Sequence, residues 1–368
     1  MFPADRLFFP VAAAFGMIAP LLWMAAISGL MHVPGAYWHG HEMLFGYALL
    51  VVAGYLVGRA KQSVLAWLLG AWLAARLAPW LAGEDSALSA LAQLAFSFTV
   101  AAVTAWPFLR AAKKLQNRVF GPLFIAFFLC DAAYQAGALS HDATLQTSAL
   151  SATIDVYALL LVMMGGRVIP AAVAGHRYRA GRVLEHRVQP PLEIGVIALL
   201  ATMIVADLFP GTRALAGACA IGAAAVTAAR AWRWELWTIV DQPHLWTLAL
   251  GYAWLVPGLA WKGYALWSTG EAPAAAQHAL GIGALGTMTL VMMARTALQR
   301  GKLPLTAFAD IALAALLMGA AAIARLAAVA TAPRAAALWL SAVLWACAYA
   351  LLLRRLLKRR PSASLQDA

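Results

Sequence analysis

The sequence predicts an all-α, polytopic transmembrane helix bundle with about twelve spans and both termini in the cytoplasm. Hydrophobic residues make up 64% of the 368 residues, and charged residues make up only 11%. Soluble domains carry about 25% charged residues, so this composition excludes an ordinary soluble enzyme and a disordered chain. The apolar residues form long unbroken runs, whereas the strands of an outer-membrane barrel alternate between apolar and polar residues.

Each apolar run is close to the roughly 20 residues that a helix needs to cross a bilayer. We expect the first run to be a span, because it is too long for the apolar core of a signal peptide. One transmembrane domain is expected over 1–355, then a basic to polar cytoplasmic tail over 356–368 that ends in a disordered segment, Pro361–Ala368. The expected spans are 8–30, 40–58, 63–82, 88–109, 119–139, 148–169, 191–210, 213–232, 244–268, 273–297, 305–330 and 334–353.

Successive connections between spans lie on opposite sides of the membrane, and the basic residues are concentrated in every second one. The net charge is +12, from 27 Lys and Arg against 15 Asp and Glu. Of the basic residues, 22 fall at the termini and in every second connection, whereas Arg213 and Arg334 alone fall in the alternate connections. This is the positive-inside pattern. It explains the basic charge by topology, so no nucleic acid partner is expected.

The predicted outer face has little Lys or Arg but holds five of the eight histidines. Imidazole is a common metal ligand, His and Met suit copper, and His serves as an axial ligand of haem iron. The densest group of such side chains, at the start of the second span, is His39, His41, Glu42 and Met43. Residues 39 and 41 point about 200° apart on a helix, so either His39 lies in a loop or the two histidines serve different centres. Alternatively, both are interfacial residues of an aromatic belt with Tyr37 and Trp38.

His278 opens the tenth span, which is rich in small residues. These would let a flat macrocycle, or equally a neighbouring helix, approach closely. Gly281, Gly283 and Gly286 spell GxGxxG, but the motif lies inside an expected span without a preceding strand, so we do not interpret it as a nucleotide site.

Ionisable residues inside spans are costly and usually functional. Arg76 and Arg325 are the partners that the sequence suggests for the buried carboxylates, without deciding the pairing. Lys262 also lies within a span. Three cysteines in apolar runs, Cys130, Cys219 and Cys347, are expected to be buried free thiols. The other ionisable residues of interest inside the spans are Asp131, Asp155 and Asp310.

Three segments of the chain resemble motifs of the NnrS family of bacterial membrane proteins. They are WHGHEMLFGY at 38–47, GGRVIP at 165–170 and HALGIGALGTMT at 278–289, in the family's order. The resemblance covers about residues 1–355 and implies a bacterial inner-membrane protein that contains haem and copper and takes part in the nitric oxide, or nitrosative stress, response. Two stretches depart from the family: Ala171 and Ala172 replace Phe-Thr, and 299–302 lacks a family histidine.

The resemblance also implies candidate ligands. His41, His278 and His39 would bind the cofactor or metal, with Glu42 and Met43 nearby. Arg167 and Arg295 match family arginines that could pair with carboxylates such as haem propionates, although both lie at the predicted inner side.

Three functions follow as hypotheses. The first is a haem- and copper-binding protein that protects against nitric oxide, with nitric oxide as a ligand and a quinol or another redox partner as the source of electrons. The second is a transporter of a small solute, metal or haem, which twelve spans and buried charges would fit. The third is a metal-binding sensor or assembly factor without turnover. The sequence does not decide whether the chain is an enzyme.

Overall fold

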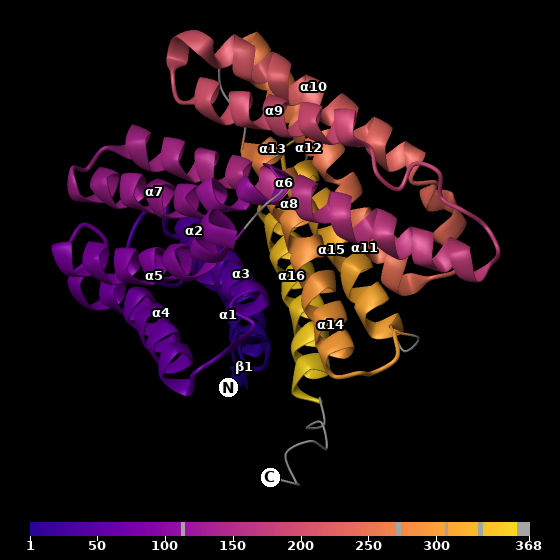
Figure 1. Ribbon diagram of the computed structural model, residues 1–368. Helices are drawn as coiled ribbons and strands as arrows, with labels where there is room; N and C mark the ends of the chain where they lie inside the picture. The colour runs from indigo at the N-terminus through magenta and orange to yellow at the C-terminus, as the bar shows by residue number, and fades with distance from the viewer. Residues whose placement is uncertain (112–114, 270–273, 306–307, 330–333, 359–368) are drawn as a thin grey trace, which may run out of the picture. The chain divides into compact units, whose positions relative to one another are not determined.

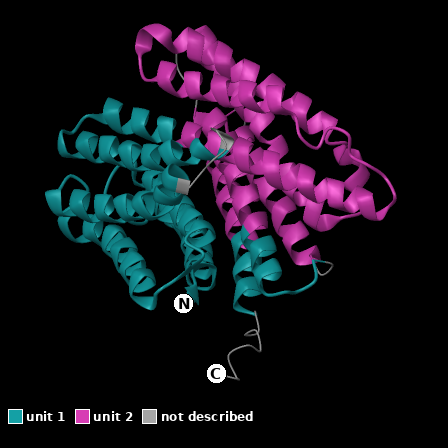
Figure 2. Cartoon of the chain, viewed as in Figure 1, with its two compact units in different colours: residues 1–153, 293–305, 349–368 teal, residues 154–292, 306–348 magenta. Residues whose placement is uncertain are grey.

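The computed structural model describes residues 1–111, 115–269, 274–305, 308–329 and 334–358 (Figure 1). The chain divides into two compact units, each built from separate parts of the sequence (Figure 2). Unit 1 comprises 1–153, 293–305 and 349–368, and unit 2 comprises 154–292 and 306–348. The expected disordered segment Pro361–Ala368 lies outside the described residues, so that expectation stays a prediction.

Unit 1 is a set of helices with one short two-stranded ladder. In Figure 1 α4, α5 and α7 lie side by side, and α1 packs on α3. β1 pairs with β2 in antiparallel register, with Phe2 opposite Ala60. The elements are β1 (Phe2–Pro3), α1 (Ala4–Ile27), α2 (Trp38–His41), η1 (Glu42–Ala48), α3 (Leu49–Leu56), β2 (Arg59–Ala60), α4 (Gln62–Ala82), α5 (Ala87–Ala111), α6 (Leu115–Arg118) and α7 (Phe120–Leu139).

Helix α8 (Ala143–Arg179) begins in unit 1 and continues into unit 2. Within unit 2, α10 packs against both α9 and α12. Helices α14 (Thr287–Arg300) and α16 (Arg334–Leu357) begin in unit 2 and end in unit 1. The remaining elements are α9 (Pro190–Asp207), η2 (Pro210–Thr212), α10 (Arg213–Arg233), η3 (Leu236–Ile239), α11 (Pro243–Ala253), α12 (Leu255–Thr269), α13 (Ala274–His278), η4 (Ala279–Gly286) and α15 (Ala309–Ala327).

The all-α polytopic class is confirmed. Among the described residues, ten helices are long and apolar enough to cross a membrane. Helices suit this environment because every backbone N–H and C=O bonds within the same segment, away from water. The other two expected spans, 40–58 and 244–268, are helical but interrupted. The first consists of α2, η1 and α3, and the second breaks between α11 and α12, where Pro257 lacks the N–H that would bond to Ala253.

Two expectations about local structure need correction. The sixth span was expected over 148–169, but α8 continues through Pro170 to Arg179 and is 37 residues long. The three cysteines are free, as expected, and Cys219 is buried. Cys347, however, is exposed and Cys130 only half-buried. Exposed side chains on a spanning helix contact lipid, so an apolar run does not by itself indicate burial inside the protein.

Candidate functional site

A buried polar network lies in unit 1 around His41 (Figure 1, α2 and α7). The Nε2 atom of His41 lies 2.9 Å from Oδ1 of Asp131 on α7. Gln135, one helical turn further along α7, donates to the same Asp131 oxygen at 3.1 Å. His41 is 2% exposed and Asp131 1% exposed. A carboxylate can only accept, so Nε2 of His41 donates to Asp131. The amide nitrogen of Gln135 also lies 3.2 Å from this Nε2.

The next residue, Glu42, continues the network toward α4 and α5. Nη1 of Arg76 donates to Oε2 of Glu42 at 2.5 Å, and Nη2 donates to Gln93. Oε1 of Glu42 lies 3.6 Å from Nδ1 of His41. Glu42, Arg76 and Gln93 are all buried. Arg76, which the sequence suggested as a partner for a buried aspartate, is therefore paired with Glu42.

The network depends on a close approach at Gly46. A Cβ atom built on Gly46 would lie 2.5 Å from Nη1 of Arg76 and 2.8 Å from Oε2 of Glu42. The backbone oxygen of Gly46 accepts a hydrogen bond from Nε1 of Trp72 at 2.7 Å. Any side chain at position 46 would displace the Arg76–Glu42 pair.

The helix that carries His41 and Glu42 changes its winding at this point. Residues Glu42–Ala48 form a π-helix, η1, directly after His41. The same feature recurs in unit 2, where Ala279–Gly286 form the π-helix η4 directly after His278. π-Helices are rare and occur frequently at functional sites, because the wider turn alters the backbone hydrogen bonding. The segment that contains GxGxxG is this π-helix, and the helix α13 precedes it.

His278 is held by its own helix. Its Nδ1 atom lies 2.6 Å from the backbone oxygen of Ala274. Because a carbonyl oxygen only accepts, the proton is on Nδ1 and the lone pair of the neutral ring is on Nε2. A histidine that binds a metal commonly donates its other ring N–H to a carboxylate or a carbonyl. His41 and His278 each make such a donation.

The first family motif does not bring its two histidines together. His39 and His41 both belong to α2, so His39 does not lie in a preceding loop. The ring of His39 stacks on Trp23 of α1, with centroids 5.5 Å apart and planes 12° apart. His41 instead lies between Phe45 and Tyr134. The two histidines thus face different neighbours. This arrangement matches the alternative in which both residues are helical and point in different directions.

The structure places the remaining candidate residues separately. Met43 is half-buried beside Glu42. Arg295 is 5% exposed and belongs to unit 1, whereas Arg167 is half-buried and belongs to unit 2. Among the described residues, no group of three or more His, Cys, Asp and Glu side chains is arranged to hold a metal ion. The ligand roles of His39, His41, Glu42, Met43 and His278 stay predictions.

Unit 2 contains a second buried charge cluster. Nζ of Lys262 lies 2.5 Å from Oδ2 of Asp155 and 3.0 Å from Oδ2 of Asp207. Lys262 and Asp155 have no exposed surface, and Asp207 is 13% exposed. Three spans, α8, α9 and α12, thus each contribute one charge. The sequence indicated Asp155 as functional but suggested arginines as its partners, and the observed partner is Lys262.

Arg230, near the end of the expected span 213–232, is one of the 22 basic residues that were attributed to topology and not to a site. It lies inside α10 and is 2% exposed. Its Nη1 donates to the hydroxyl of Tyr252 at 3.4 Å, and its guanidinium lies 5.4 Å from the centroid of Trp234. Gly166 of the GGRVIP motif contacts this guanidinium, because a Cβ there would overlap Arg230. Trp234, four residues after Arg230 and so on the same face of a helix, was the available signal.

The protein-family comparison agrees with these motifs. The model of the family described as NnrS protein matches residues 4–359, nearly the whole chain. No curated protein and no solved structure matches the chain. The chain belongs to the NnrS family.

Proposed function

We propose that this chain is a haem- and copper-binding protein of the bacterial inner membrane that acts in the response to nitric oxide. Family membership supports the link to nitric oxide. The haem proposal is based on the hydrogen bonding and position of two histidines. His41 and His278 each donate one ring N–H to an oxygen, and each directly precedes a π-helix.

Haem fits the residues present better than a closed copper centre does. An axial haem ligand requires a single imidazole whose other nitrogen is fixed by a hydrogen bond. His278 meets this requirement. His41 has its Nε2 fixed by Asp131, but its Nδ1 faces Oε1 of Glu42 at 3.6 Å, so haem iron would bind there only if Glu42 moved aside. Among the described residues, no cluster of three or more His, Cys, Asp or Glu side chains could hold a copper ion. The proposal of copper binding is therefore based on the family and on the donor chemistry of His41, Glu42 and Met43.

The residues around His41 suit a bound cofactor in two further ways. Asp131 holds the orientation of the His41 ring. Phe45 and Tyr134, at centroid distances of 4.8 and 4.5 Å from His41, fix the plane of the ring and exclude water. A bound haem iron would supply the chemistry of nitric oxide binding. Its electrons would come from a quinol or another redox partner.

The test is the haem and copper content of protein purified in mild detergent. We expect His41→Ala and His278→Ala to lose most of the haem. His141→Ala is the control, because His141 is also at the predicted outer face but is 75% exposed. If both variants keep the wild-type content, the ligand assignment is wrong. If the wild-type protein stays colourless after reconstitution with haem, the haem proposal fails, and transport of a small solute, metal or haem becomes the favoured alternative.

A further inference from the structure

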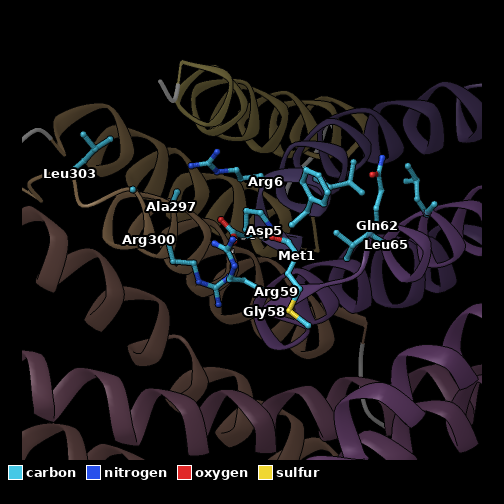
Figure 3. Close-up of a pocket in the computed structure, with 16 residues that line it drawn as sticks. Met1, Asp5, Arg6, Gly58, Arg59, Gln62, Leu65, Ala297, Arg300 and Leu303 are labelled. Carbon is cyan, nitrogen blue, oxygen red and sulfur yellow. Dashed lines mark hydrogen bonds and ion pairs between the residues drawn. The ribbon is translucent and has the colours of Figure 1, made fainter. Parts of the chain in front are cut away.

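Unit 1 contains a cavity of about 1030 Å³ where its first and fourth helices begin (Figure 3). It lies beside the β1–β2 ladder, and the end of α14 closes one side. The cavity lies at the ends of the membrane helices α1 and α4, where the headgroups of a bilayer are expected. Neither His41 nor His278 lines it, so it is separate from the candidate haem ligands.

Part of the wall is strongly basic. Arg6, Arg59 and Arg300 line the cavity, with Asp5 as the carboxylate among its lining residues. Figure 3 shows the Arg300 side chain next to Asp5 and near Arg59. One carboxylate cannot neutralise three guanidinium groups, so the wall keeps an excess of positive charge.

Contacts with the chain hold two of these arginines, Arg59 and Arg300, in position. Nη1 of Arg300 donates to Oδ1 of Asp5 at 2.8 Å, and its Nη2 donates to the backbone oxygen of Tyr55 at 3.0 Å. Nη2 of Arg59 donates to the backbone oxygen of Met1 at 3.0 Å. Each guanidinium carries five N–H donors, so these contacts leave donors of Arg59 and Arg300 for a ligand. A preorganised guanidinium binds phosphate oxygens well, often with two parallel hydrogen bonds.

The adjoining wall is apolar. Leu65, Ala66 and Leu69 line the cavity from α4, and Leu303 lines it from the segment after α14. Ala66 is exposed and Leu69 half-exposed on a helix that is apolar enough to cross a membrane. A ligand with an anionic head and a hydrocarbon tail therefore matches both walls, whereas a small free anion matches only the basic wall.

We propose that this cavity binds one anionic phospholipid, with the phosphate at Arg59 and Arg300 and an acyl chain along Leu65 and Leu69. Basic pockets between membrane helices on the cytoplasmic side are suited to anionic headgroups. The distribution of Lys and Arg assigns this end of unit 1 to the cytoplasmic side. The lipid site does not depend on haem binding.

The test is the retention of lipid by the full-length protein in detergent, measured by native mass spectrometry and by the thermal unfolding midpoint. Phosphatidylglycerol, phosphatidylcholine and inorganic phosphate are compared at equal concentrations. We expect phosphatidylglycerol alone to be retained and to raise the midpoint. Removing one arginine weakens its binding about fivefold, so Arg59→Gln and Arg300→Gln each lower retention by this factor, whereas Arg59→Lys keeps more of it than Arg59→Gln.

Arg182→Gln is the matched control, because Arg182 is an exposed arginine on the same predicted side but outside the cavity. If Arg182→Gln and Arg59→Gln lose lipid retention equally, general surface charge explains the binding and the proposed site is wrong. Equal retention of phosphatidylcholine would also overturn it. Protection by inorganic phosphate alone would assign the cavity to a free anion instead of a lipid.

Discussion

Nε2 of His41 lies 2.9 Å from Oδ1 of Asp131, and both side chains are almost fully buried inside a set of membrane helices. In such surroundings a carboxylate is expensive unless a donor satisfies it. The pair joins the first family motif on α2 to a residue of α7 that lies 90 positions away in sequence. It gives His41 the fixed proton position that a metal-binding histidine needs.

The first prediction concerns this pair. Asp131→Asn keeps the size of the side chain but removes the charge that orients His41. Removing such a partner of a ligand typically lowers affinity about 10–100-fold, so we expect haem titrated into the cofactor-free variant to bind that much more weakly. Asp85→Asn is the control, since Asp85 is 58% exposed. Unchanged haem affinity in Asp131→Asn would mean that His41 does not bind the haem.

A second prediction follows from the close approach at Gly46. Gly46→Ala places a methyl group 2.5 Å from Nη1 of Arg76, and such overpacking costs about 1–3 kcal/mol. The thermal unfolding midpoint in detergent should fall. Gly70→Ala on α4 is the matched control, because no atom lies within 4 Å of its added Cβ. It should be neutral or stabilising by up to about 1 kcal/mol, owing to the higher helix propensity of Ala. Equal midpoints for the two variants would contradict the packing described at Gly46.

The third prediction concerns the charge cluster of unit 2. Lys262→Met leaves Asp155 and Asp207 without their cation, and breaking a buried pair on one side costs about 3–5 kcal/mol. We expect poor recovery of folded protein and a much lower midpoint. Adding Asp155→Asn to Lys262→Met should restore part of the loss, because it removes one of the two carboxylate charges left without a cation.

Lys61→Met serves as the control for Lys262→Met, because Lys61 is exposed. Its midpoint should match that of the wild type. A wild-type midpoint in Lys262→Met, or no recovery in the double variant, would show that Lys262 does not stabilise the fold through its two carboxylates.

The fourth prediction concerns sidedness. A reporter fused at Lys302 should be cytoplasmic, and one in the 83–87 loop should be outside. The structure of unit 1 agrees with this assignment: Arg300 binds Asp5, and the β1–β2 ladder joins residue 2 to residue 60. The N-terminus, the segment around residue 60 and the end of α14 are therefore at one end of the unit, as the Lys and Arg pattern requires. The reverse reporter pattern would contradict the orientation and move the histidines to the cytoplasmic face.

Composition and hydropathy were enough to predict the fold class, because a membrane restricts the chain to a few architectures. Local interruptions were harder to predict. The π-helices η1 and η4 change the winding within apolar runs whose composition stays uniform. The break before α12 did have a signal in Pro257.

The candidate site was predictable in its parts but not in its pairing. Asp131 and Asp155 were recognisable as costly buried charges. Their partners, His41 and Lys262, lie 90 and 107 residues away, and no local spacing brings them together. Arg230 was attributed to topology because positive charge near a helix end normally reports it, whereas its burial is decided by the packing of α10.

The most direct test of haem and nitric oxide binding is the visible absorption spectrum of the purified wild-type protein, before and after nitric oxide is added. We expect a Soret band that shifts with nitric oxide and that is largely lost in His41→Ala and in His278→Ala. A wild-type protein that binds no haem on reconstitution, or a Soret band that nitric oxide leaves unchanged, would contradict the central claim.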